Sequence, residues 1–486
     1  MNVHVQMSPW EALLVLGAFA LVLVRWLPPG LRRPVTFGAA AGVVLSGAVL
    51  GLLGLRWQMV PVLAAAAVAL PFALSPLLRR ATRRAPWWLA LPGSAVCLAL
   101  VAAGPAAVWA VPAPVFPEPT GRFAVGTGVL ELTDPERAES ATAAPDDRRT
   151  VVVQFWYPAR KHPAGSRPAP YLGRTEHEAR LVSGALADYA GLPGFLLDGL
   201  PRARTHAAFG VPAADGAPGE DAGGGSAERF PVVLFSPGLG GVRTQNTAWA
   251  EELAAHGYVV VGLDHPYDSA AVVLADGRTV RTEVSATGDD AEDEKRAAAW
   301  TAVRAADLSF VRAQLGRIDG GEIAGPLAGH LDTARVAAAG HSLGGGAALQ
   351  AARQDPAFAA VIDLDGFPHD PSPQPFRQPV LALTQAIGPD TDPDYLPKLT
   401  RVLGLSSATT YRLTVPGAAH LTFTDAPLYL PPLPSLVGSL GRTEGPRITA
   451  GASLAFLDAA LRDGRGDPAA ALSAYGTLAV HRPGGS

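Results

Sequence analysis

The stretch VAAAGHSLGGGAALQAAR, residues 336–353, decides the fold. Its first five residues form a short apolar run typical of a buried β-strand, and residues 343–353 have the composition of a helix. The motif Gly-x-Ser-x-Gly joins the two segments, as in the tight strand-to-helix turn that exposes a nucleophilic serine. This stretch therefore predicts an α/β sheet enzyme with Ser342 as the nucleophile and the Leu343 N–H as a donor to an oxyanion.

Strand and helix candidates alternate on both sides of this motif. We expect strands at residues 124–132, 150–157, 230–236, 258–263, 336–340, 359–364, 379–384 and 409–415, and helices at 244–256, 291–315, 343–353, 395–403 and 447–461. Continuous apolar strands between helices predict a mostly parallel sheet covered on both faces. We expect a catalytic domain over residues 121–465, interrupted by a Gly-rich loop at 213–228, and a C-terminal tail at 466–486.

A serine nucleophile of this kind needs a base that follows it in the chain. Three histidines follow Ser342. His481 lies in the tail, which we expect to fray, and His369 follows Asp365 too closely to occupy a separate loop. His420 ends the small-residue stretch PGAAH after a predicted strand, so we predict that it is the base.

Two carboxylates compete for the third position, Asp363 and Asp365 in the segment VIDLDGFP. Both point to one face of the predicted strand. Asp365 stands at the carboxyl end beside a glycine and can leave the sheet toward the histidine loop. Asp363 lies deeper and would be costly to bury without a partner. We therefore favour Asp365, with Asp363 as the alternative.

The second oxyanion donor should come from the loop after an early strand. The stretch FSPGLGG, residues 235–241, provides it, and we assign the role to the Leu239 N–H. His265 follows another predicted strand at the same edge of the sheet and is a candidate to line the site. The chain has one cysteine and no His spacing typical of a metal site, so we expect no metal and no cofactor.

The first 112 residues have a different composition from the rest. They contain eight arginines, one acidic residue and no lysine, for a net charge of +7, whereas the remainder carries −11. Uncharged runs occur at 12–24, 34–55, 57–78 and 85–117. The last three are long enough to cross a bilayer, and Trp26 and Leu27 extend the short first run past Arg25. We predict a transmembrane region of four helices over residues 1–111 and a Pro-rich linker over 112–120.

The arginines also predict an orientation. Arg25, Arg32 and Arg33 lie in the first connection and four more, at 79–84, lie in the third, whereas the second holds Arg56 alone. Because positive charge favours the cytoplasmic side, connections one and three should be cytoplasmic. We therefore expect a multi-pass protein of the cell membrane, with its catalytic domain on the extracytoplasmic side.

The chain resembles the plasma-type platelet-activating-factor acetylhydrolase family in the motifs WYPA (156–159), FSPGLGG, GHSLGG (340–345) and LDGFP (364–368), and in the late His420. The resemblance covers residues 121–461. It implies an α/β-hydrolase fold, a metal-independent Ser342–Asp365–His420 triad, oxyanion donors at Leu239 and Leu343, and cleavage of short or oxidised acyl groups from phospholipids. The family commonly has FSHG where this chain has Pro237, and an aromatic residue where it has Leu343.

Three functions are compatible with these features. The first is a membrane-anchored serine hydrolase of carboxylic esters, with a lipid or small ester as substrate. The second is an acyltransferase to a lipid or sugar acceptor, which would use the same triad. The third is a membrane protein whose exterior domain only binds a ligand. A net charge of −4 gives no basic surface for nucleic acid, and the sequence does not determine the oligomeric state.

Overall fold

The computed structural model describes residues 7–78, 86–161, 165–215, 229–284, 287, 289–386, 388, 392–462 and 467–483. The chain divides into two compact units, Met1–Pro112 and Ala113–Ser486.

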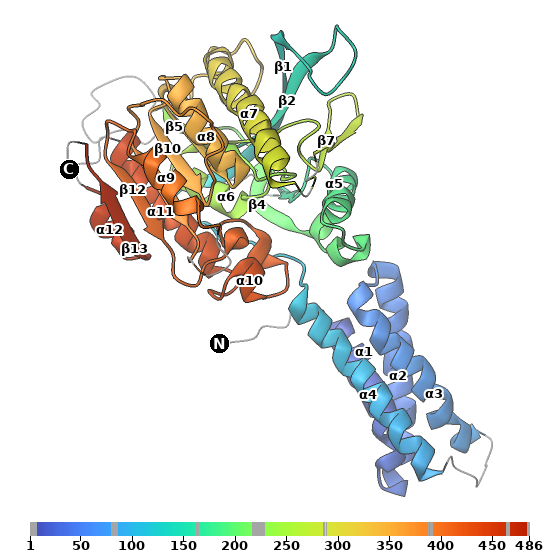
Figure 1. The fold of residues 1–486 in the computed structure, drawn as a ribbon. Coiled ribbons are helices and arrows are strands. Elements are labelled where there is room, and N and C mark those ends of the chain that lie inside the picture. Colours follow the sequence, from blue (N-terminus) through green and yellow to red (C-terminus); the bar gives the residue numbers. More distant parts are fainter. Residues whose placement is uncertain are drawn as a thin grey trace. The chain divides into compact units, whose positions relative to one another are not determined.

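The first unit is built from four apolar helices (Figure 1). They are α1 (Pro9–Leu23), α2 (Pro29–Leu53), α3 (Val60–Leu78) and α4 (Trp87–Ala110), with short 3-10 turns at Val24–Trp26 and Trp57–Met59. Each helix, in two cases together with the adjacent 3-10 turn, is long and apolar enough to cross a membrane. Arg79, Arg80, Arg83 and Arg84 lie outside the described residues.

Small residues let these helices approach closely. A Cβ on Gly17 would come within 2.9 Å of a Val43 methyl, and one on Gly104 within 2.4 Å of a Val62 methyl. Such contacts are typical of helix pairs in membranes, where dispersion rather than water exclusion holds helices together. Glu11 forms a capping box with Ser8 at the start of α1.

The second unit contains an 11-stranded sheet in the order β13-β12-β11-β10-β9-β5-β6-β2-β1-β4-β3. The six strands from β12 to β6 are parallel. Its strands are β1 (Ala124–Ala138), β2 (Arg148–Ala159), β3 (Pro168–Pro170), β4 (Arg204–Phe209), β5 (Phe230–Ser236), β6 (Val259–Asp264), β9 (Leu331–His341), β10 (Ala360–Leu364), β11 (Val380–Thr384), β12 (Thr410–Thr414) and β13 (Thr477–His481). A two-stranded sheet joins β7 (Ala271–Val273) to β8 (Thr279–Arg281).

Helices cover both faces of the large sheet. On one face, Val232 and Leu234 of β5 pack with α7 (Asp290–Asp319) and α8 (Leu343–Gln354), which lie side by side (Figure 1). On the other, Val233 and Phe235 pack with α6 (Thr247–Ala255) and α11 (Glu444–Leu461). Neighbouring residues of one strand thus serve opposite cores, which is why these strands are apolar throughout. The remaining helices are α5 (Glu176–Tyr189), α9 (Tyr395–Leu403), α10 (Pro434–Val437) and α12 (Ala469–Ser473).

The predicted fold class, a mostly parallel sheet between helices preceded by an apolar helical region, is confirmed. Two boundary predictions need correction. The segment expected to be a frayed tail contains β13, which pairs with β12 from Thr477 to His481. The segment at 112–120, expected to be a Pro-rich linker, is packed at Phe116, which is only 3% exposed and whose ring centroid lies 4.8 Å from that of Tyr171.

Candidate active site

Ser342 stands at the turn between β9 and α8, where the backbone takes a strained conformation with φ +56°. This conformation is rare for a residue with a side chain and typical of a nucleophile elbow. The two motif glycines are required by space. A Cβ on Gly340 would lie 2.1 Å from the Gly344 carbonyl oxygen, and one on Gly344 would lie 2.0 Å from that of Ser236.

The structure brings the three residues predicted as a triad together. The Ser342 Oγ lies 2.9 Å from the His420 Nε2, and the His420 Nδ1 lies 2.7 Å from the Asp365 Oδ2. When Nδ1 carries the proton and donates a hydrogen bond to Asp365, the lone pair of Nε2 faces the serine hydroxyl. His420 begins a short 3-10 turn (His420–Phe423) after β12, and Asp365 follows β10 with φ +52°.

The two competing carboxylates have different surroundings. The Asp365 Oδ1 accepts hydrogen bonds from the Tyr395 hydroxyl at 3.0 Å and the Gln385 N–H at 2.8 Å, besides the Oδ2 contact with His420. The Asp363 Oδ1 accepts only the Gly366 N–H, and its Oδ2 is buried with no partner among the described residues. Burial, together with the charge of Asp365, raises the pKa of Asp363 well above its usual value. Asp363 does not reach His420 in this arrangement.

The loop after β5 lies against the elbow, since a Cβ on Gly238 would be 3.5 Å from the Ser342 Cβ. Two of its amides have partners. The Gly238 N–H donates to the Gln245 Oε1 and the Gly241 N–H donates to the Gly238 carbonyl oxygen. Within the described chain the Leu239 N–H has no partner. The Leu343 N–H is also unpaired within its helix, because Leu343 is the first residue of α8.

His265 does not line an open site, contrary to the prediction. It is completely buried, with Nε2 2.9 Å from the Ser236 Oγ and Nδ1 2.8 Å from the Asp307 Oδ2. Burial lowers the pKa of His265 despite the hydrogen bond that Asp307 accepts from its ring. A second Ser–His–Asp chain thus lies beneath the loop, closed to substrate.

Two residues that the sequence analysis did not select hold the base loop. The His341 Nε2 lies 2.9 Å from the His420 carbonyl oxygen, and its Nδ1 lies 2.8 Å from the Gln245 Nε2. Burial, with a further contribution from His420, lowers the pKa of His341 to about 3, so its ring is neutral. Because the His341 ring is neutral, it does not repel the positive charge that His420 would acquire as a catalytic base. Only the position of His341 inside the elbow motif could have suggested this.

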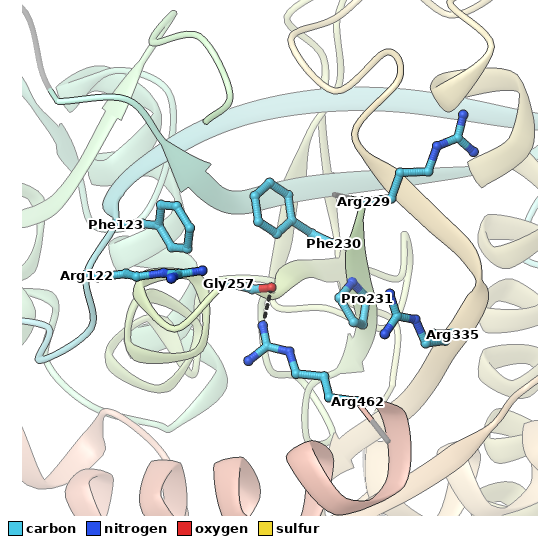
Figure 2. A pocket seen from close by; sticks show the side chains of 8 residues that line it. All are labelled: Arg122, Phe123, Arg229, Phe230, Pro231, Gly257, Arg335 and Arg462. Carbon is cyan, nitrogen blue, oxygen red and sulfur yellow. Dashed lines mark hydrogen bonds between the residues drawn. The ribbon is translucent and has the colours of Figure 1, made fainter. Parts of the chain in front are cut away.

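A pocket of about 120 Å³ lies away from Ser342, at the start of β5 (Figure 2). It is lined by Arg122, Phe123, Arg229, Phe230, Pro231, Gly257, Arg335 and Arg462. Three of its arginines are paired with aspartates: Arg229 with Asp319, Arg335 with Asp332, and Arg462 with Asp458. Because it adjoins the amino ends of the strands, opposite to the elbow, it is not an acyl site.

The comparison with known families matches the geometry. Residues 111–312 and 318–466 match the family model for platelet-activating factor acetylhydrolase, isoform II. The chain belongs to this family. As a member of the platelet-activating factor acetylhydrolase family it is a carboxylic ester hydrolase.

Several proteins similar to this chain are esterases or acetylhydrolases by name. A probable 1-alkyl-2-acetylglycerophosphocholine esterase of Arthroderma benhamiae is 29% identical over 328 residues, which are 64% of this chain and 76% of that protein. The platelet-activating factor acetylhydrolase of Cavia porcellus is 31% identical over 173 residues, 30% of this chain and 39% of its relative. A ferulic acid esterase from Streptomyces cinnamoneus superposes with a TM-score of 0.58 at 25% identity, covering 76% of this chain and all of the esterase.

Metal ligands are not gathered anywhere in the described part of the chain. No group of three or more His, Cys, Asp or Glu side chains there could hold an ion. The arrangement of Ser342, His420 and Asp365 can instead perform acyl transfer through the serine oxygen.

Proposed function

We propose that this family member is a membrane-anchored serine hydrolase that removes short acyl groups from lipid esters. The observation that carries the proposal is the chain of contacts from Ser342 through His420 to Asp365, at 2.9 and 2.7 Å. The relatives named for alkyl-acetyl-glycerophosphocholine favour a phospholipid with a short acyl group. The four apolar helices of the first unit would hold the enzyme in the membrane from which such lipids come.

The reaction would run in two steps. His420 Nε2 takes the proton of the Ser342 hydroxyl as Oγ attacks the ester carbonyl, while Asp365 holds the imidazole and stabilises its positive charge. The N–H groups of Leu239 and Leu343 receive the oxyanion. The protonated His420 gives its proton to the leaving alcohol, and an acyl-serine remains. Water, deprotonated by His420, then releases the carboxylic acid.

The test uses the full chain in detergent micelles. We expect it to hydrolyse p-nitrophenyl acetate and butyrate and to release acetate from a 2-acetyl phosphatidylcholine, and we expect Ser342→Ala to abolish both reactions. Full activity in Ser342→Ala, or no turnover of any ester by folded wild type, would contradict the proposal. Adding a lyso-lipid or a sugar alcohol during turnover identifies an acyltransferase, if the acyl group appears on the acceptor rather than as free acid.

A further inference from the structure

The oxyanion loop, residues 237–241, consists mostly of glycines, whose backbone conformation no side chain restricts. In the segment from Pro237 to Gly241, three of five residues are glycine, and Gly240 has φ +67°. Glycine crosses between backbone regions at little cost, so a peptide unit between such residues can rotate. A rotated Gly238–Leu239 peptide would present a carbonyl to the oxyanion instead of the Leu239 N–H. Contacts from outside the loop must therefore fix the orientation of the Gly238–Leu239 peptide.

Arg304 of α7 contacts this loop from beneath. Its side chain is completely buried. The Arg304 Nη2 donates to the Gly238 carbonyl oxygen at 3.0 Å, and Nη1 donates to the carbonyl oxygen of Pro237. One guanidinium thus binds two successive peptide units, a geometry that its planar fork of donors allows and an ammonium does not.

Because a peptide unit is planar, a hydrogen bond to its C=O also fixes the direction of its N–H. The chain has no cis peptide bond among its described residues. Across a trans peptide the C=O and the N–H point in opposite directions. Because Arg304 and the Gly241 N–H both bind the Gly238 oxygen, the Leu239 N–H must point away from them. No hydrogen-bond partner for the Leu239 N–H is found in the described chain, and this N–H belongs to the peptide unit whose carbonyl oxygen Arg304 binds.

The Arg304 side chain is itself held in place by Asp268. The Arg304 Nε lies 2.6 Å from the Asp268 Oδ2, and the Nη2 lies 2.5 Å from the Asp268 Oδ1. Below the loop, the buried chain of Ser236, His265 and Asp307 holds the residue that precedes Pro237.

We propose that Arg304 is a positioning residue that keeps the Gly238–Leu239 peptide in the orientation in which Leu239 donates to the oxyanion. The proposal rests on the proposed function, because it assumes acyl transfer at Ser342. It implies that the oxyanion hole is formed before substrate binds. Arg304 acts through the Gly238–Leu239 peptide, which lies between its guanidinium and the proposed oxyanion position.

Lysine is the informative replacement at position 304. Arg304→Lys retains a positive charge for Asp268 but cannot bind both carbonyls. With the full chain in detergent, we expect kcat for p-nitrophenyl butyrate to fall by about 10- to 10³-fold, the upper limit being the loss of a whole donor. KM should stay within about threefold, because ground-state binding does not use the hole. The affinity for a butyl trifluoromethyl ketone, whose adduct with Ser342 carries an oxyanion, should fall by the same factor as kcat.

Two further variants separate positioning from stability. Arg312→Lys changes another arginine of α7 that is paired with an aspartate, Asp355, and should leave kcat and ketone affinity unchanged. If Arg304→Lys does not fold, the double variant Arg304→Gln with Asp268→Asn removes both buried charges and should show the same paired loss. A folded variant with wild-type kcat, or one whose kcat falls without loss of ketone affinity, would overturn the role of Arg304. Retained activity in Ser342→Ala would instead overturn the proposed function.

Discussion

The contacts of single residues distinguish the two carboxylates that the sequence leaves in competition. Asp365 accepts two hydrogen bonds and also contacts His420, whereas Asp363 is buried with one partner among the described residues. We expect Asp365→Asn to lower kcat by as much as ~10⁴-fold, since it loses the acceptor that orients the base. Asp363→Asn should keep most of the wild-type kcat, because burial already holds Asp363 in its neutral form. Steady-state rates with p-nitrophenyl butyrate check both, and equal losses would contradict the assignment.

The pH dependence of stability should report on His341. Its pKa is about 3 in the folded protein, below the ordinary 6.5. Between these values the unfolded chain binds a proton that the folded protein does not, so stability should fall as the pH drops through this window and be complete above it. Thermal unfolding of the full chain from pH 7.5 to 4.5 should show this decline, with a smaller slope in His341→Gln. His177→Gln, which removes an exposed histidine, is the control. An equal slope in all three proteins would contradict the linkage.

Sequence order predicts the residues that meet at Ser342 better than those that hold them. The elbow motif and the rule that acid and base follow the serine lead to His420 and to the pair of carboxylates Asp363 and Asp365. Arg304 contacts carbonyl oxygens 66 and 67 residues away, and backbone carbonyls carry no sequence signal. The same holds for His265, which the sequence places at the correct edge of the sheet but not at its true depth.

At the scale of elements, the parallel strands were predictable because most of them, such as β5 and β6, are apolar on both faces. The edges were harder. Only partly buried apolar residues of β13 contact the core, so its short alternating pattern resembles a tail. The helix α5 buries only one stripe and follows an irregular segment, and the prediction omitted it. Edge elements are half exposed, and their patterns are correspondingly weak.

The segment before β1 should contribute to the stability of the second unit rather than act as a free spacer. Phe116 packs beside Tyr171, and its carbonyl oxygen lies 3.1 Å from the His206 Nε2. We expect Phe116→Ala to destabilise this unit by about 3–5 kcal/mol, the usual cost of removing a buried aromatic ring. Val115→Ala is the matched control, because Val115 is 60% exposed. Chemical unfolding monitored by tryptophan fluorescence measures the difference, and equal effects would show that the segment is a linker.

For the whole molecule, the open prediction is the side of the membrane on which the enzyme works. Arg56 lies 3.6 Å from Glu11, so the second connection and the start of α1 share one end of the helical unit. The other end receives Arg25, Arg32 and Arg33, which by the positive-inside rule should be cytoplasmic. Four crossings then return the chain to the side on which it began. The hydrolase unit would meet lipids of the outer leaflet or lipids arriving from outside.

Cysteine labelling tests this orientation, because Cys97 is the one cysteine of the sequence and can be replaced by alanine. In that background, Ser140→Cys places a thiol at an exposed position of the second unit, and Gly30→Cys places one at the exposed start of α2, next to the first connection. We expect a membrane-impermeant maleimide to label residue 140 in intact cells and residue 30 only after lysis. The reverse pattern would place the active site in the cytoplasm. Labelling of both in intact cells would mean that the four helices do not all cross the membrane. Retained ester hydrolysis by each variant shows that the labelled protein is folded, so either pattern is decisive for topology.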